Sequence, residues 1–218
     1  MLTDNYRHQG LRKKLVDFLQ NERGISDPDV LTAIGNVPRH LFLDAAFLNH
    51  AYEDKAFQIG EGQTISQPYT VAYQSMLLKA KKGMTLLEIG TGSGYQASVL
   101  CEMGIKVYSI ERHRPLFELC RKRLDKLGYG KIKTKYGDGF LGWPAFAQYD
   151  RILITAAAPE LPRTLIDQLK PGGIMVIPYD HPEVKGQIMM RITKTEEGQL
   201  MREEFEQFRF VPMLKGKV

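Results

Sequence analysis

A short apolar segment that runs directly into closely spaced glycines constrains this chain more than any other feature. Residues Thr85–Ile89 have the composition of a buried strand, and glycines follow at positions 90, 92 and 94. Glycine lets a backbone turn sharply and approach a ligand without a Cβ in the way. A helix expected over residues 95–103 would present free N–H groups at its start. The pattern predicts a ligand-binding turn between a strand and a helix.

Segments typical of strands and helices alternate from residue 68 onward. We expect helices at 68–79, 95–103, 115–127 and 161–169, and strands at 85–89, 106–110, 132–136, 150–155 and 174–178. Residues 170–173, Lys-Pro-Gly-Gly, form a stop signal for the last of these helices. Because parallel strands need crossover connections, the alternation predicts a doubly wound α/β fold with helices on both faces. Ligands of such sheets lie beyond the carboxyl ends of the strands.

The N-terminal part departs from this alternation. Apolar spacing predicts a helix over residues 5–21, and Ser26 or Asp27 ahead of Pro28 predicts a second helix that ends before Pro38. Residues 49–67 are irregular and polar, and we expect a loop region with little periodic structure. Long loops in compact domains are often functional.

Length and composition indicate one globular domain. The chain has 218 residues, 43% of them hydrophobic, which suits a single buried core. We expect one domain over residues 1–218, with N-terminal helices and a loop in 1–80, a ligand-binding core in 81–180 and further strands in 181–218. In that last part, residues 187–193 and 200–208 should pair as antiparallel strands at one edge of the sheet.

Charge, cysteine and histidine usage argue against several classes of protein. The 30 basic and 25 acidic residues give a net charge of +5 that is spread along the chain, unlike a concentrated nucleic-acid footprint. Cys101 and Cys120 are too far apart for a C-x-x-C motif, which indicates reduced thiols of a cytoplasmic protein. The scattered histidines predict no metal site. No apolar run approaches the roughly 20 residues that span a bilayer, so we expect no membrane segment.

The glycine spacing distinguishes between two kinds of nucleotide. A dinucleotide fingerprint, G-x-G-x-x-G, would need a third glycine where this chain has Tyr95. The spacing is instead G-x-G-x-G, preceded by the acidic Glu88. That pattern fits the loop of an S-adenosylmethionine-dependent methyltransferase, whose ligand has no pyrophosphate. A tight turn without a ligand is the alternative.

The next two strands end in carboxylates that suit the same ligand. Glu111 follows the strand at 106–110, where it can accept hydrogen bonds from both hydroxyls of a ribose. Asp138, between Gly137 and Gly139, can accept one from the adenine amino group. Acidic residues at strand ends are common and Asp138 could sit in a simple turn, but their order behind the glycine loop favours a nucleoside site.

The fourth strand restricts the methyl acceptor. Methylation of a base nitrogen usually requires an Asn or Asp that is followed by Pro and an aromatic residue. Residues 155–159, Thr-Ala-Ala-Ala-Pro, lack this motif. Metal-dependent catechol methylation would need a cluster of carboxylates, and only Asp138 is available at these strand ends.

The segment at 59–68, Ile-Gly-Glu-Gly-Gln-Thr-Ile-Ser-Gln-Pro, resembles the signature of the protein-L-isoaspartate O-methyltransferases. Further matches lie at 37–39, 87–97, 137–139, 142–144, 155–159 and 210–213, so that the resemblance spans residues 37–213. The one mild departure is Met213, where the family often has Leu.

The resemblance implies a Rossmann-like methyltransferase fold that binds S-adenosyl-L-methionine and releases S-adenosyl-L-homocysteine. The acceptor would be the free carboxylate of an L-isoaspartyl residue, or more weakly a D-aspartyl residue, in a damaged protein, and the ester would collapse through a succinimide. We expect a cytoplasmic monomer without nucleic-acid or membrane partners. The expected cofactor-binding residues are Gln63, Thr64, Ile65, Ser66, Glu88, Gly90, Thr91, Gly92, Ser93, Gly94, Glu111, Arg112, Gly137, Asp138 and Gly139.

By the same resemblance, Ser66 is the catalytic residue, and Ser66, Gln67, Pro68, Val211 and Pro212 bind the substrate. Ser66 or Gln67 could also cap the helix that Pro68 opens. A carboxylate acceptor with a pKa near 4 is ionised at pH 7, so it needs no base. We expect residues 49–67 to help cover the site. A methyltransferase acting on RNA or a small molecule, or a non-catalytic binder of the cofactor, are the competing interpretations.

Overall fold

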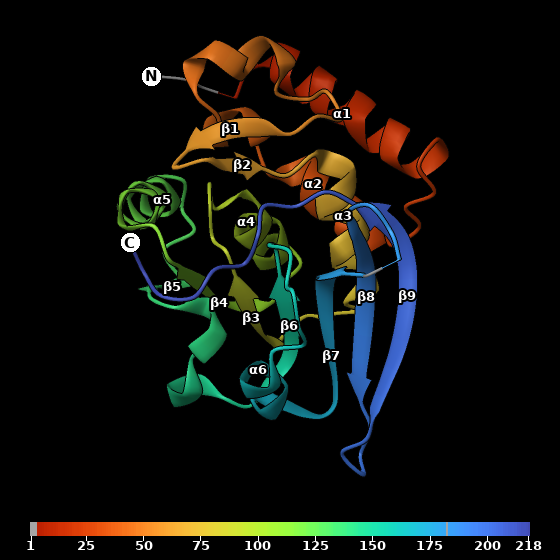
Figure 1. Ribbon diagram of the computed structural model, residues 1–218. Coiled ribbons are helices and arrows are strands. Elements are labelled where there is room, and N and C mark those ends of the chain that lie inside the picture. The colour runs from red at the N-terminus through yellow and green to blue at the C-terminus, as the bar shows by residue number, and fades with distance from the viewer. Residues whose placement is uncertain (1–3, 182) are drawn as a thin grey trace.

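The computed structural model of the protein describes residues 4–181 and 183–218. Its centre is a seven-stranded sheet with the strand order β5-β4-β3-β6-β7-β8-β9 (Figure 1). The strands are β3 (Thr85–Ile89), β4 (Lys106–Glu111), β5 (Lys133–Tyr136), β6 (Tyr149–Ile154), β7 (Leu169–Asp180), β8 (Gln187–Lys194) and β9 (Leu200–Phe208). The five strands from β5 to β7 are parallel, and β8 and β9 run antiparallel to their neighbours. Both the doubly wound sheet and its antiparallel edge pair are therefore confirmed.

The central strand β3 is the point where the strand order reverses. It pairs with β4 on one side and β6 on the other, and Ile89 at its end lies beside Ile110 and Ile154. The chain turns away on both sides of this point, which leaves a space beyond the carboxyl ends of the strands. The glycine loop follows β3, Glu111 is the last residue of β4, and Thr155 follows β6.

Side chains alternate between two buried layers on the faces of the sheet. On β3, Leu86 packs into the larger layer and Leu87 into the smaller one. The larger layer lies under the helices α1 (Tyr6–Asn21), α2 (Pro28–Asn36), α3 (Pro68–Leu77), α4 (Tyr95–Glu102) and α5 (Arg114–Lys126). The smaller layer lies under α6 (Arg163–Asp167) and the 3-10 turns η3 (Gly139–Leu141) and η4 (Pro144–Phe146). In Figure 1, α1 to α4 and α6 lie on opposite sides of the sheet.

Residues 49–67 differ from the expected irregular loop. The 3-10 turns η1 (Arg39–Phe42) and η2 (Ala45–His50) lead into an antiparallel hairpin of β1 (Phe57–Gly60) and β2 (Gln63–Ile65). Gly60, Glu61 and Gly62 all have positive φ at its tip. The expectation of little regular structure was wrong because strands of three and four residues are too short to show an alternating pattern.

The stop signal at 170–173 was also misread. Strand β7 already begins at Leu169, which pairs with Tyr149 of β6, and a bulge follows in the register between the two strands. Helix α6 is accordingly only five residues long. Pairing with β6 outweighs the local preference of Pro and Gly for a turn. Among the described residues, none of the helices has both the length and the apolar content to cross a bilayer.

Candidate active site

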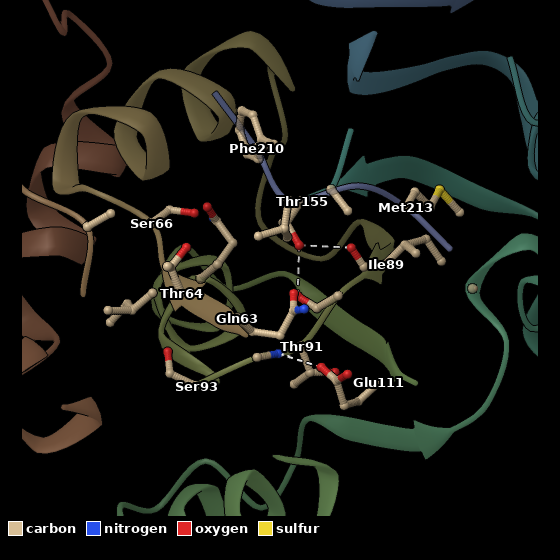
Figure 2. A pocket seen from close by; sticks show the side chains of 18 of the residues that line it. Gln63, Thr64, Ser66, Ile89, Thr91, Ser93, Glu111, Thr155, Phe210 and Met213 are labelled. Carbon is tan, nitrogen blue, oxygen red and sulfur yellow. Dashed lines mark hydrogen bonds between the residues drawn. The ribbon is translucent and has the colours of Figure 1, made fainter. Parts of the chain in front are cut away.

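A cavity opens at the carboxyl ends of β3, β4 and β6, where the strand order reverses (Figure 2). One wall is strand β2 with the start of α3, and another is the segment that follows β9. The floor is the glycine loop and the ends of the strands. Segments far apart in the sequence therefore contribute to one site.

The glycine loop has a geometry that larger residues would not allow. Gly90 has a φ of 98°, and a Cβ there would collide with Oγ1 of Thr155. That hydroxyl contacts the carbonyl oxygens of Ile89 at 2.9 Å and Gly90 at 2.8 Å. Gly92 has a φ of 52° and lies under Ile59 of the hairpin. The loop therefore packs between Thr155 and Ile59 of β1.

Glu111 is buried at the end of β4, with its carboxylate facing the cavity. Its Oε2 accepts a hydrogen bond from the Gly92 N–H at 2.8 Å, and its Oε1 accepts one from the His113 N–H at 2.9 Å. Each carboxylate oxygen has a further lone pair. Two fixed backbone donors therefore orient this carboxylate while leaving capacity for two ligand hydroxyls.

Asp138 occupies a different position from the one expected of an adenine ligand. It begins the turn η3, where Oδ1 accepts from the Phe140 N–H at 2.8 Å and Oδ2 from the Gly216 N–H at 2.7 Å. Gly139 lines the cavity, whereas Asp138 and Gly137 do not. The Asp138 carboxylate therefore links the C-terminal segment at Gly216 to turn η3.

Glu88 lies beneath the glycine loop and not in the cavity wall. Its side chain is fully buried, and burial raises its pKa to about 8, so its carboxyl is mostly neutral at pH 7. The Ser109 hydroxyl donates to Oε2, and Thr91 Oγ1 lies 2.6 Å from the same hydroxyl. Glu88 thus supports the loop through Ser109 and Thr91 without facing the cavity.

Ser66 lies at the cavity wall just before α3, and Figure 2 shows its side chain beside Thr64. The N-cap of α3 is Gln67, which makes no side-chain capping bond. The capping acceptor is Asp54, whose Oδ1 accepts from the Tyr69 N–H at 2.8 Å. Ser66 therefore does not serve as the cap, and its hydroxyl is available for a ligand.

The segment after β9 is fastened to the turn beyond β6. The Ala157 N–H donates to the Val211 carbonyl at 2.8 Å, and the Met213 N–H donates to the Ala157 carbonyl at 2.7 Å. Pro212 lies between them in a parallel bridge. The expected substrate residues Val211 and Pro212 thus reach the same cavity as Ser66.

Most of the expected site residues meet in this cavity. Those that line it are Gln63, Thr64, Ile65, Ser66, Gln67, Gly90, Thr91, Gly92, Ser93, Glu111, Arg112, Gly139, Val211 and Pro212, and those that do not are Pro68, Glu88, Gly94, Gly137 and Asp138. Sequence reasoning assigned no ligand role to several other lining residues, including His113, Thr155, Arg209 and Phe210. The family resemblance could have indicated a role at the site for Thr155 and Phe210, because both lie within segments that match the family.

The fold also brings together side chains that lie apart in the sequence and do not line this cavity. Ligand atoms of Asp4, His8 and His40 lie within 4.8 Å of one another. The Arg12 guanidinium binds both oxygens of Asp4 at 3.0 and 2.9 Å. Because a cation already occupies that carboxylate, we assign no metal to the group.

Comparisons with known proteins agree with this architecture. A family model described as protein-L-isoaspartate(D-aspartate) O-methyltransferase (PCMT) matches residues 10–218. A protein-L-isoaspartate O-methyltransferase of Cytophaga hutchinsonii is 56% identical over 213 residues, which cover 98% of this chain and 95% of the relative. One of Christiangramia forsetii is 52% identical and covers 99% of this chain and 100% of the relative.

Solved structures give the same result. A protein-L-isoaspartate O-methyltransferase structure has a TM-score of 0.83 at 31% identity and covers 92% of this chain, which spans 65% of that longer chain. A Plasmodium falciparum protein solved with S-adenosyl-L-homocysteine has a TM-score of 0.80 at 24% identity, with 94% of this chain and 98% of that chain covered, and shows the shared fold.

Together the sheet, the glycine loop and the carboxylate at the end of β4 define an S-adenosyl-L-methionine-dependent methyltransferase. Within that class, the chain belongs to the protein-L-isoaspartate O-methyltransferase family.

Proposed function

We propose that this chain transfers a methyl group from S-adenosyl-L-methionine to the free carboxylate of L-isoaspartyl residues, and more weakly of D-aspartyl residues, in damaged proteins. The observation that carries the proposal is the shared cavity of Ser66 and Glu111. Ser66 belongs to the segment that carries the family signature, and Glu111 belongs to the expected nucleoside site. Figure 2 shows the two side chains on different sides of one space.

The residues on the floor fit the nucleoside part of the cofactor. Glu111 presents a carboxylate that two backbone N–H groups orient, and Gly90 and Gly92, both at positive φ, place no Cβ between the backbone and a ligand. When bound, S-adenosyl-L-methionine supplies an electrophilic methyl group. In this proposal Glu111 holds the ribose hydroxyls, and Gln63, Thr64, Thr91 and Ser93 line the rest of the cofactor. In this proposal Asp138 supports the adenine end through the backbone N–H groups of Phe140 and Gly216, not by a direct contact.

Ser66 and the backbone of Val211 and Pro212 would hold the acceptor. Because a carboxylate near its ordinary pKa of about 4 is already ionised at pH 7, the site needs no general base. The task of the site is to align the reacting groups. Such alignment can lower the activation barrier by on the order of 7 kcal/mol. The Ser66 hydroxyl suits this task because it can orient a carboxylate without neutralising it.

The β1–β2 hairpin would exclude water from the site. Ile59 lies directly over Gly92, and Oε2 of Glu61 at the hairpin tip lies 3.9 Å from Nδ1 of His113. Methyl transfer to a carboxylate neutralises an ion pair, so a covered site of low polarity favours it. The hairpin lies within residues 49–67, the segment expected to help cover the site.

We further propose that residues 1–218 act as one catalytic domain, as a monomer in the cytoplasm and without a nucleic-acid partner. The distribution of the +5 net charge along the whole chain supports the last point. Labelling a cell extract with methyl-labelled cofactor and this chain tests the acceptor class. Base-labile label in protein is expected, whereas label in RNA or metabolites would favour the competing methyltransferases, and absence of S-adenosyl-L-homocysteine would favour a non-catalytic binder.

A further inference from the structure

The guanidinium of Arg209 lines the cavity and pairs with no other group among the described residues. Arg209 follows β9 directly and lines the cavity, two residues ahead of Val211. Its side chain is exposed, and within residues 4–181 and 183–218 it has neither an ion pair nor a hydrogen bond. An arginine without a partner at the wall of a binding cavity is available for an anionic ligand.

The other positively charged or basic groups of the cavity wall belong to its cofactor end. Arg112 follows Glu111 directly and donates to the carbonyl oxygens of Gly216 at 3.3 Å and Lys215 at 3.4 Å. The backbone N–H of His113 donates to Oε1 of Glu111, and Nε2 of its imidazole lies 3.3 Å from Nη1 of Arg112. Both groups stand at or just after the end of β4, beside Glu111, and not in the segment after β9.

Charge in the cavity is therefore divided between two ends. Glu111 is the one carboxylate among the described residues that line it, and it stands at the end of β4. Arg209 directly follows β9 and precedes Phe210, and Figure 2 shows Phe210 and Ser66 at one end of the cavity and Glu111 at the other. The negative end suits hydroxyl donors, and the positive end suits a carboxylate.

We infer that Arg209 is a specificity-determining residue that recognises the free carboxylate of the acceptor and selects for anionic acceptors. This inference rests on the proposed function. The charge of an exposed guanidinium attracts the carboxylate toward Ser66 without burying an ion pair, which would oppose methylation. The product is a neutral methyl ester. Because it lacks this attraction, it should bind more weakly than the acceptor and dissociate more readily.

The test compares two peptides that differ only in the charge of the acceptor. One contains L-isoaspartate, and the other has a carboxamide in place of the free carboxylate. Binding to the full chain is measured by calorimetry in the presence of S-adenosyl-L-homocysteine, alongside KM and kcat for the isoaspartyl peptide. The variants are Arg209→Gln, Arg209→Lys and the control Arg202→Gln, an exposed arginine on β9 that does not line the cavity.

The wild-type chain should prefer the acid to the carboxamide, and Arg209→Gln should reduce that preference by about tenfold, because a charge-assisted hydrogen bond is lost. KM should rise by a similar factor, with a smaller change in kcat. Arg209→Lys should restore part of the preference, and the control should match wild type. The wild-type KM should also rise with salt more steeply than that of Arg209→Gln.

An unchanged acid-to-carboxamide ratio in Arg209→Gln would overturn the inference and leave the proposed function intact, provided that the wild-type chain methylates the isoaspartyl peptide. A fall in kcat with an unchanged ratio would also overturn it, because that result indicates a structural role. If the wild-type chain methylates no isoaspartyl peptide, the proposed function fails and the inference fails with it.

Discussion

Arg39 donates a hydrogen bond from Nη2 to the carbonyl oxygen of Ser66 at 2.8 Å. The guanidinium is fully buried and also donates to the carbonyls of Ala51 at 3.1 Å and Lys55 at 3.2 Å. Burial lowers its pKa, and the Tyr95 ring, 4.8 Å from the guanidinium carbon, lies against the cation. One buried cation thus joins the segment before the hairpin to the residue that follows it.

Replacement of Arg39 by Met should therefore affect both stability and the site. Three backbone acceptors would lose a charged donor, and we expect the free energy of unfolding to fall by about 3 kcal/mol. KM for an isoaspartyl peptide should rise, because Ser66 loses its support. Urea denaturation of Arg39→Met beside Arg7→Met, an exposed arginine of α1, measures the effect. Equal stability of the two variants would contradict the role of Arg39.

Ser66→Ala should lower turnover far more than stability. Since Gln67 and Asp54 occupy the start of α3, the serine hydroxyl makes no capping bond whose loss would cost about 1 kcal/mol. We expect kcat/KM to fall by about tenfold or more through loss of a hydrogen bond to the acceptor carboxylate. Steady-state kinetics and thermal melts of the same preparation separate the two effects. A loss of stability with normal turnover would show that Ser66 is only structural.

Glu111→Ala should weaken cofactor binding. The variant would lose both acceptor oxygens and leave the N–H groups of Gly92 and His113 without their carboxylate. We expect the affinity for S-adenosyl-L-homocysteine to decrease by roughly 1.5 to 3 kcal/mol, measured by calorimetry. Asp138→Asn is the comparison, and it should bind the cofactor more nearly normally, since Asp138 does not line the cavity. Normal affinity in Glu111→Ala would remove Glu111 from the site.

Glu88→Gln should change how stability depends on pH. Burial raises the pKa of Glu88 from 4.5 to about 8, so the folded protein favours the neutral carboxyl. The stabilisation of the wild-type chain is fully present below pH 4.5 and is lost as the pH rises to about 8, because the group must ionise in a buried site. Relative to Glu88→Gln, wild-type stability should fall by up to about 1.4 kcal/mol per pH unit in that window. Parallel curves for the two proteins in urea titrations between pH 5 and 8 would contradict a buried neutral acid.

The features predicted correctly from sequence are those with strong local signals. The spacing of the glycines after an apolar strand indicates the glycine loop. Helix α5 is indicated by apolar residues four positions apart, Leu116, Cys120 and Leu124, which are buried in the structure. The β1–β2 hairpin was missed because its strands are too short to show a period. The start of β7 at Leu169 was missed because pairing with β6, which is distant in sequence, outweighs the Pro-Gly-Gly stop signal.

The cavity brings together most of the residues expected at the site, but not all of the expected carboxylates. Glu111 lines the cavity, whereas the carboxyl groups of Glu88 and Asp138 are hydrogen-bonded within the protein, because a sequence does not show on which side of the backbone a carboxyl group points. The role of Arg39 depends on three carbonyls from later segments, and that of Arg209 on a segment that returns to the sheet near the end of the chain. Such contacts exist only in the folded chain.

The most direct test of the proposed function is methyl transfer to a matched pair of peptides. One contains an L-isoaspartyl residue, the other contains the normal aspartyl residue at the same position, and both are incubated with the purified chain and methyl-labelled S-adenosyl-L-methionine. We predict base-labile label in the isoaspartyl peptide and none above background in the aspartyl peptide. Equal labelling of the two peptides, or labelling of neither, would contradict the account.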